Sequence, residues 1–233
     1  MLRSKNRIYF LLVVIIILVA FSLVPVSDFI TANAEPRSVL IIDPGHGGED
    51  GGAVATNGTL ESRINLQIAL RLEALADFCG VTTVMTRRTE EISYPESADT
   101  LSAKKKADQN ARVALINSTP GGVLLSIHQN YYPSESPWGI QVFYGDVAGS
   151  DVLATETQKN LTEQLCPNNR RLATPMSESI YLIKKANCPA ILVECGFLSN
   201  PSERNALETH SYQLELASVM LASYLQYIRG IST

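Results

Sequence analysis

Short apolar runs alternate with helical stretches along most of this chain, and this alternation limits the possible folds more than any other feature. Strands are expected at residues 38–42, 81–86, 123–127, 138–144, 179–183 and 190–193. Helices are expected at about residues 61–79, 101–117, 151–165 and 213–228. Strands that alternate with helices build a sheet of mostly parallel strands covered by the helices. We therefore predict a single α/β domain with a twisted, mostly parallel sheet flanked by helices.

The N-terminal segment differs from the rest of the chain and is not expected to belong to this domain. Arg3, Lys5 and Arg7 precede an apolar run over residues 8–26. Such a run is about long enough to cross a bilayer, and flanking positive charge stays on the cytoplasmic side. Residues 32–34 match the A-x-A pattern of a signal-peptide cleavage site. We expect residues 1–35 to be a membrane anchor or a cleaved signal, and residues 36–233 to form an extracytoplasmic domain.

The charge balance gives no reason to expect a nucleic-acid-binding protein. The formal net charge is −4, whereas domains that bind nucleic acid normally carry a basic surplus. Three consecutive lysines at residues 104–106 fall within an expected helix. We interpret them as a solvated helix face.

The four cysteines, Cys79, Cys166, Cys188 and Cys195, form no C-x-x-C pair. A zinc knuckle or a thioredoxin-like redox site is therefore not indicated. Cys79 ends an apolar helical stretch and is expected to be a core residue. Cys166 and Cys188 could pair in an oxidising compartment, but spacing alone does not establish connectivity.

Three ionisable residues follow the ends of expected strands. His46 lies in the glycine-rich turn over residues 43–52, His128 follows the strand at 123–127, and Glu194 follows the run at 190–193. In open α/β sheets, ligands bind outside the carboxyl ends of the strands. We therefore expect His46 and His128 to share one site. The third histidine, His210, lies between two helical stretches and is expected to be a surface or capping residue.

Two histidines and one carboxylate are a common ligand set for catalytic zinc, which keeps a further position for water. The candidate carboxylates are Asp43, Glu49, Asp50, Glu61 and Glu194. Glu61 begins an expected helix, and the glycine loop can fold back to bring it beside His46. A zinc-activated water next to a spare carboxylate hydrolyses amides. The residues thus indicate an extracytoplasmic zinc hydrolase without identifying its substrate.

Other interpretations of the remaining polar and aromatic residues stay open. Glu194 could instead form a buried ion pair with Arg87, Arg88 or Arg112. Trp138 and Tyr144 are expected to pack in the core rather than to stack on a sugar. Of the adjacent Tyr131 and Tyr132, at least one could line a substrate groove.

Four separated motifs resemble the zinc-dependent N-acetylmuramoyl-L-alanine amidases of the amidase-3 type. They are DPGHGG at residues 43–48, Glu61 at the head of a helix, SIHQN at residues 126–130 and VECGFLSN at residues 193–200. The resemblance covers residues 38–229. It implies that His46, Glu61 and His128 bind zinc and that Glu194 is the catalytic acid/base. Asp43 is then a candidate partner for a ligating histidine.

Three further stretches, at residues 112–117, 139–144 and 180–184, resemble the spore-cortex branch of this family, the CwlD-like amidases. That resemblance implies cleavage of the amide between N-acetylmuramic acid and L-alanine, which prepares muramic-δ-lactam formation in the cortex. Peptidoglycan is then the expected substrate. The N-terminal segment is expected to be the contact with the membrane. Whether an activating partner protein is needed stays an open question. The alternatives are a zinc peptidase acting on stem-peptide bonds and a non-catalytic peptidoglycan-binding module.

Two residues depart from the common pattern of the family. Gln129 stands where many members have alanine, and we expect it to face the substrate groove. Cys195 stands where an aliphatic residue is commoner, and we expect it to be a packing residue.

Overall fold

Six strands form a single sheet in the computed structural model, which describes residues 38–176 and 180–231. The strands are β1 (Val39–Pro44), β2 (Thr83–Met85), β3 (Gly122–Asn130), β4 (Gln141–Tyr144), β5 (Thr174–Pro175) and β6 (Ala190–Phe197). Their order across the sheet is β2-β1-β3-β6-β4-β5. Every neighbouring pair is parallel except β4 and β6. The predicted mostly parallel sheet is thus confirmed.

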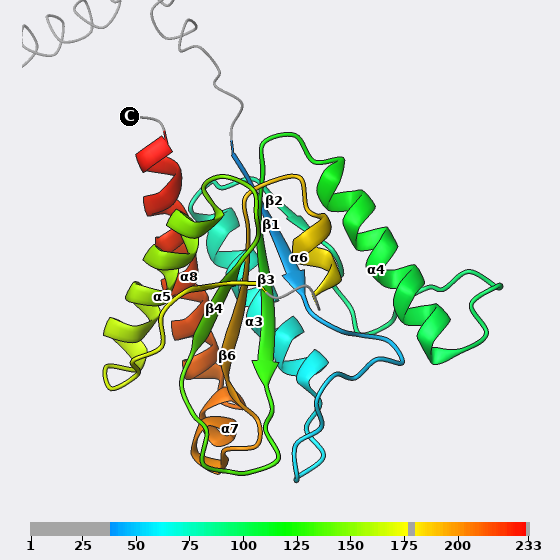
Figure 1. Ribbon diagram of the computed structural model, residues 1–233, viewed down its shortest axis with the longest axis horizontal. Helices are drawn as coiled ribbons and strands as arrows, with labels where there is room; N and C mark the ends of the chain where they lie inside the picture. The colour runs from blue at the N-terminus through cyan, green and yellow to red at the C-terminus, as the bar shows by residue number, and fades with distance from the viewer. Residues whose placement is uncertain (1–37, 177–179, 232–233) are drawn as a thin grey trace, which may run out of the picture. The chain divides into compact units, whose positions relative to one another are not determined.

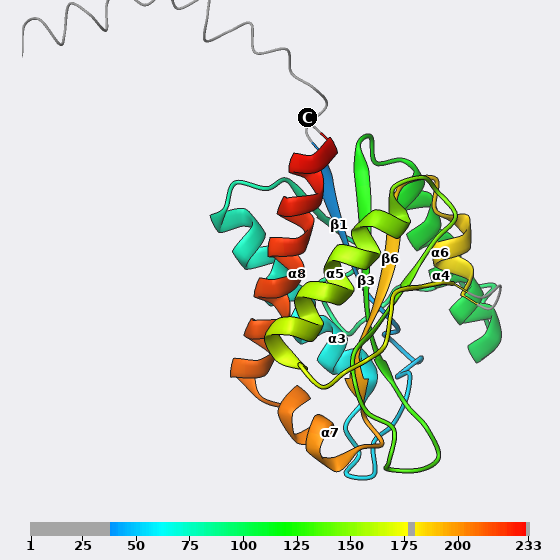
Figure 2. The same ribbon diagram turned by 60° about the vertical axis from the view of Figure 1, so that its left-hand side comes forward.

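Helices cover both faces of this sheet (Figure 1). They are α3 (Glu61–Phe78), α4 (Leu101–Asn117), α5 (Ser150–Leu165), α6 (Tyr181–Lys185), α7 (Pro201–Leu207) and α8 (His210–Ile231). Helices α3, α5 and α8 pack together on one face, whereas α4 and α6 lie on the other (Figure 2). The domain is therefore a three-layer α/β/α arrangement.

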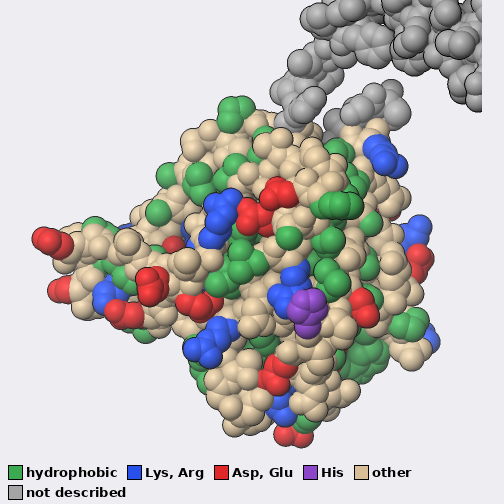
Figure 3. All heavy atoms as spheres, turned by 180° about the vertical axis from the view of Figure 1, so that it is seen from behind, with side chains coloured by type: hydrophobic (Ala, Val, Ile, Leu, Met, Phe, Trp, Pro, Cys, Tyr) green, Lys and Arg blue, Asp and Glu red, His purple; other side chains and the backbone are tan. Residues whose placement is uncertain are grey.

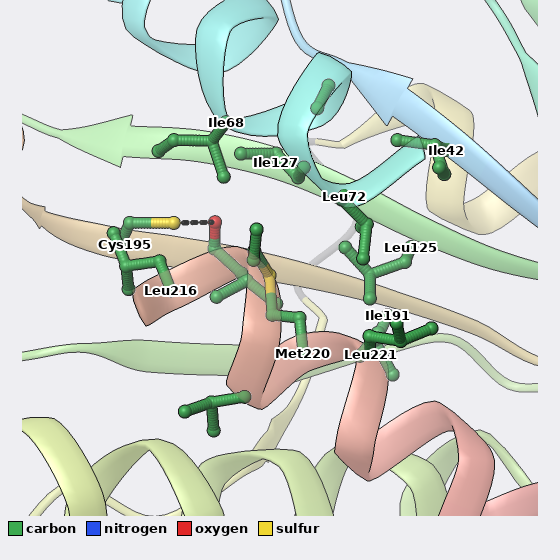
Figure 4. Close-up of a cluster of buried hydrophobic side chains, with 14 of the residues drawn as sticks. Ile42, Ile68, Leu72, Leu125, Ile127, Ile191, Cys195, Leu216, Met220 and Leu221 are labelled. Carbon is green, nitrogen blue, oxygen red and sulfur yellow. Dashed lines mark hydrogen bonds between the residues drawn. The ribbon is translucent and has the colours of Figure 1, made fainter. Parts of the chain in front are cut away.

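The central strands are buried on both faces, which explains why they read as continuous apolar runs. Leu40 and Ile42 of β1 point into the larger hydrophobic cluster, on the α3 side of the sheet, and Ile41 points into the smaller cluster. Figure 4 shows part of the larger cluster, with Ile68 and Leu72 of α3 beside strand residues. Because side chains alternate along a strand, one apolar run supplies both cores.

The surface mixes charges of both signs. On the face seen in Figure 3, acidic and basic side chains are interspersed among polar and apolar ones. In the described part of the chain, no helix is both long enough and apolar enough to cross a membrane. The expected anchor or signal at residues 1–35 lies outside the described residues.

Two predicted strands differ from the structure. The prediction of a strand at residues 179–183 is wrong over the part that the structure describes, because Tyr181–Lys185 forms helix α6. The helical turn directs the adjacent residues Leu182 and Ile183 into the smaller core, whereas a strand would point them to opposite faces. Strand β4 begins at Gln141 rather than at residue 138.

Two packing predictions also fail, and two short elements were not predicted. Trp138 keeps 44% of its surface exposed, so its expected place in the core is wrong, whereas Tyr144 packs against the larger cluster as expected. Cys79 caps the end of α3 and is exposed instead of buried. Strand β5 and helix α7 were not anticipated from the sequence.

Candidate metal centre and active site

Three adjacent strands bring the predicted site residues to one edge of the sheet. His46 directly follows the Gly45 that leaves β1, while His128 lies near the end of β3 and Glu194 within β6. Strands β1 and β6 both pair with β3 in parallel. As expected, His46 and His128 lie close together, with their ring centroids 5.0 Å apart.

Glu61 completes a compact cluster with the two histidines. Its Oε1 lies 2.9 Å from His128 Nδ1 and 3.4 Å from His46 Nε2. One ligand atom from each of the three side chains falls within 4.8 Å of the others. This is the two-histidine, one-carboxylate donor set that catalytic zinc uses.

The loop between β1 and α3 folds back on itself, as the sequence suggested. Ala53 N donates to Glu61 Oε2 (2.9 Å), and Glu61 N donates to Ala53 O (2.9 Å). His46 adopts φ +59°, a left-handed conformation that non-glycine residues rarely take outside functional sites. The loop therefore stores backbone strain at the residue that joins the cluster.

Two glycines of this loop leave room for the cluster side chains. A Cβ on Gly45 would lie 2.2 Å from the His128 ring, and one on Gly52 would lie 2.6 Å from Glu61 Oε2. Gly52 also has φ +68°. Any side chain at either position would collide with the cluster.

Asp50, rather than the predicted Asp43, is the partner of a cluster histidine. His46 Nδ1 donates to Asp50 Oδ2 (3.0 Å), and Lys105 Nζ lies 2.9 Å from the same oxygen. Asp43 instead accepts hydrogen bonds from Ser126 and Arg112. The prediction for Asp43 fails because its side chain leaves β1 toward α4 and β3. Lys105 is thus a contact of the site and not only part of a solvated face.

The charges within the cluster perturb its pKa values in the metal-free state. Burial would lower the pKa of His46, but the Asp50 and Glu61 carboxylates outweigh it and raise that pKa to about 9. Burial would raise the pKa of Glu61, but hydrogen bonds from His128 and His46 hold it below its usual range. Since a metal ligand must be deprotonated, a metal ion would compete with a proton at His46.

Two buried arginines hold the backbone of the loop. Arg112 donates to Pro44 O (2.8 Å) and His46 O (2.6 Å). Arg87 donates to Pro44 O (2.9 Å) and Gly45 O (3.0 Å). Three successive carbonyls are thereby fixed, which keeps His46 in its strained conformation. From the sequence, both arginines were expected only as possible partners of Glu194.

Glu194 has no ion pair among the described residues, which contradicts the alternative of a buried salt bridge. Arg87 pairs with Glu90, and Arg88 pairs with Glu73. Arg112 bonds to Asp43 and to the loop carbonyls instead. Glu194 Oε2 is buried and has no hydrogen-bond partner in the described part of the chain. Burial raises the pKa of this carboxyl to about 7. Such a group can both take up and release a proton near neutral pH.

A pocket of roughly 360 Å³ opens beside the cluster. Its walls include Glu194, Lys105, Gln109, Tyr131 and Tyr181. Tyr131 therefore lines the groove, as predicted for at least one of the two adjacent tyrosines.

The other residues singled out in the sequence lie outside the metal cluster. Gln129 borders the pocket, but it is only 3% exposed and donates to the Asn65 side chain. His210 is exposed at the start of α8, as predicted. Cys195 is fully buried, as expected of a packing residue. Cys166 and Cys188 are both free, so the structure contains no disulfide between them.

Comparisons with known proteins agree with this geometry. The family described as N-acetylmuramoyl-L-alanine amidase (Amidase_3) matches residues 40–223. The germination-specific N-acetylmuramoyl-L-alanine amidase of Bacillus subtilis is 37% identical over 190 residues, which span 81% of this chain and 79% of the relative. The amidase LytC of the same organism is 32% identical over 84% of this chain, but the match covers only 37% of LytC.

Solved structures show the same fold. The CwlD amidase from Clostridioides difficile, solved in complex with the GerS lipoprotein, superposes with a TM-score of 0.79 and 32% identity. That match covers 82% of this chain and 98% of the CwlD chain. An N-acetylmuramoyl-L-alanine amidase from Clostridium difficile 630 gives a TM-score of 0.71 at 29% identity, covering 83% of this chain and 97% of the other.

Proposed function

This chain belongs to the family of N-acetylmuramoyl-L-alanine amidases, and from that premise we propose that it is a zinc hydrolase whose metal is held by His46, Glu61 and His128. The bond cleaved is the amide between N-acetylmuramic acid and L-alanine in peptidoglycan. The observation that best supports the mechanism is the buried Oε2 of Glu194, which lies beside the cluster and has no hydrogen-bond partner among the described residues.

The cluster fits a zinc ion by its chemistry. Its donors are two imidazoles and one carboxylate, all within 4.8 Å of one another. Asp50 accepts the second N–H of His46, as the outer partners of zinc ligands commonly do. Zinc bound there would lower the pKa of a coordinated water to about 7 and polarise the scissile carbonyl.

Glu194 then performs the proton transfers. Its carboxylate takes the proton of the attacking water and passes it to the nitrogen of L-alanine as the amide bond breaks. The raised pKa of the group, about 7 without metal, suits both halves of this task. A carboxylate that is ion-paired with an arginine would have a pKa too low for it to return the proton.

The biological setting is also part of the proposal. The relative from Bacillus subtilis is named as germination-specific, which supports a role in germination. We propose further that the substrate is spore-cortex peptidoglycan and that cleavage prepares muramic-δ-lactam formation. The CwlD amidase was solved with a lipoprotein, so a partner protein is a further hypothesis for this chain. We propose that residues 1–35 direct the enzyme out of the cytoplasm, as a membrane anchor or a signal.

The test uses the chain from residue 36, loaded with zinc, on purified peptidoglycan. New L-alanine N-termini and bound zinc are measured for the wild type, Glu194→Gln and the surface control Glu163→Gln. We expect release by the wild type and the control, and a loss of at least about 100-fold in Glu194→Gln with zinc retained.

Other products would contradict the proposal. N-termini other than L-alanine would indicate a stem-peptide peptidase. No release, together with no zinc bound, would indicate a peptidoglycan-binding module.

A further inference from the structure

Asn65 is a fully buried amide directly behind the metal cluster. It lies on α3 one turn after Glu61 and has 0% of its surface exposed. Its Nδ2 donates to Gly45 O (3.1 Å) and Glu61 Oε1 (3.3 Å). Its Oδ1 accepts from Gln129 Nε2 (3.1 Å). One side chain thus contacts three separate segments of the chain.

Each of these segments supplies one member of the cluster. Gly45 precedes His46, Gln129 follows His128, and Glu61 is itself a member. The three members of the cluster come from the loop after β1, from β3 and from α3. The Asn65 side chain is hydrogen-bonded to each of these three segments. The Asn65 amide therefore links the three segments that carry the proposed ligands.

Only an amide has the donors and the acceptor that this position requires. Asparagine offers two N–H donors and a carbonyl acceptor and carries no charge. Aspartate would place a second carboxylate against Glu61 and could not donate to Gly45 O. An apolar residue of similar size would fill the space but leave three buried polar groups without this partner, which is costly.

Asn65 is one of three donors outside the cluster that orient the Glu61 carboxylate. Gln129 N donates to Oε1 (3.1 Å), and Ala53 N donates to Oε2 (2.9 Å). With Asn65, the carboxylate is held from the helix, the loop and the strand, and its remaining side faces the histidines. Such outer contacts typically change metal affinity about 10- to 100-fold when removed.

We propose that Asn65 is a positioning residue for the metal centre, with Gln129 as its support, a role that rests on the proposed zinc function. Asn65 does not touch the substrate. It acts by holding Glu61 and the backbone beside His46 and His128 in the arrangement that binds the metal.

The experiment compares the full-length wild type, Asn65→Leu and Gln129→Met. Gln129→Met keeps the approximate volume of the side chain and removes its bond to Asn65, so it serves if Asn65→Leu does not fold. The matched control is Gln158→Met, a buried amide on α5 that holds Val142 N and Ile140 O and has no hydrogen bond to any of the three proposed ligands among the described residues. Zinc affinity is measured by competition with a chelator, and thermal unfolding is followed without metal. The visible spectrum of the cobalt-loaded protein reports ligand geometry.

We expect zinc affinity to fall about 10- to 100-fold in Asn65→Leu and less in Gln129→Met, with an altered cobalt spectrum. Gln158→Met should lower only the unfolding temperature. Unchanged affinity and spectrum in both site variants, or an equal loss of affinity in Gln158→Met, would overturn the positioning role. If the wild type binds no zinc, or if His46→Ala leaves its zinc affinity unchanged, the proposed zinc function fails instead.

Discussion

His128 and Glu194 are direct partners across the parallel strands β3 and β6. Residues paired in this way point to the same face of a sheet, so the register places the free carboxyl next to a member of the metal cluster. A slip of one residue would turn Glu194 to the opposite face. The register is set by the buried runs before each residue, including Leu125, Ile127, Ile191 and Val193. The hydrophobic core thus positions the proposed acid/base.

The burial of Glu194 should make the metal-free protein less stable at high pH. Its pKa is about 7 in the folded protein and near 4.5 in the unfolded chain, so the folded state binds the proton more tightly. Stability is therefore lost as pH rises from about 4.5 to 7 and stays lower above that range. Glu194→Gln removes this loss. We expect its stability relative to the wild type to increase across this interval, by on the order of 1–3 kcal/mol.

Denaturant unfolding at several pH values, with a chelator present, measures this difference directly. Glu163→Gln on the surface of α5 is the control and should show no such trend. A difference between Glu194→Gln and the wild type that does not vary with pH would contradict the raised pKa.

Asp50 should support metal binding through His46. Asp50→Asn replaces the carboxylate that accepts the His46 Nδ1 proton, and we expect zinc affinity to fall about 10- to 100-fold. The neighbouring Glu49→Gln is the matched control, because Glu49 pairs with Lys104 on the surface and is not a member of the cluster. Competition with a chelator measures both variants. Equal affinities in the two would mean that Asp50 does not orient the histidine.

The positions of His46, His128 and Glu194 could be predicted because the apolar runs before them are unambiguous. A run such as residues 39–42 must be a buried strand, and the ends of parallel strands meet at one edge. Glu61 could be selected from five carboxylates only through the family motif. The glycine loop allowed several foldings, and its closure depends on contacts such as Ala53 N to Glu61 Oε2.

The outer contacts of the site could not be predicted from the same pattern. Asp43 and Asp50 are both close to His46 in sequence, and which of them faces it depends on the left-handed φ of His46. Arg87 and Arg112 come from distant segments, so their bonds to the loop carbonyls leave no local signal. Helix α6 was missed because a five-residue apolar stretch does not distinguish a strand from a helical turn.

Substitutions at two glycines of the loop between β1 and α3 should separate the effect of backbone strain from that of a steric collision with the cluster. Gly52 (φ +68°) and Gly58 (φ +85°) both adopt left-handed backbone, but only Gly52 faces the cluster. Gly58→Ala should cost about 1–2 kcal/mol of stability and leave zinc affinity unchanged. Gly52→Ala should lose zinc binding as well, because its Cβ would meet Glu61 Oε2 and His46. Calorimetry of unfolding and zinc titration separate the two effects; retained affinity in Gly52→Ala would contradict the expected collision.

The buried pair of Arg112 and Asp43 should be strongly coupled. Their side chains are 2.8 Å apart and almost fully buried. Burial would raise the pKa of Asp43, but Arg112 and the Ser126 and Thr86 hydroxyls hold it below the usual value. Arg112→Met leaves a buried charge without its partner, and we expect a loss of about 3–5 kcal/mol. Zinc affinity should fall too, since His46 O loses its donor.

A double-mutant cycle with Asp43→Asn tests that coupling. Because the substituted amide carries no charge to leave unpaired, the double variant should be less destabilised than the sum of the two single variants. The exposed pair of Arg88 and Glu73 is the control, for which the same cycle should give about 0–1 kcal/mol. Additive losses at Arg112 and Asp43 would show that Arg112 acts through the loop carbonyls alone. In that case zinc affinity would still fall in Arg112→Met but not in Asp43→Asn.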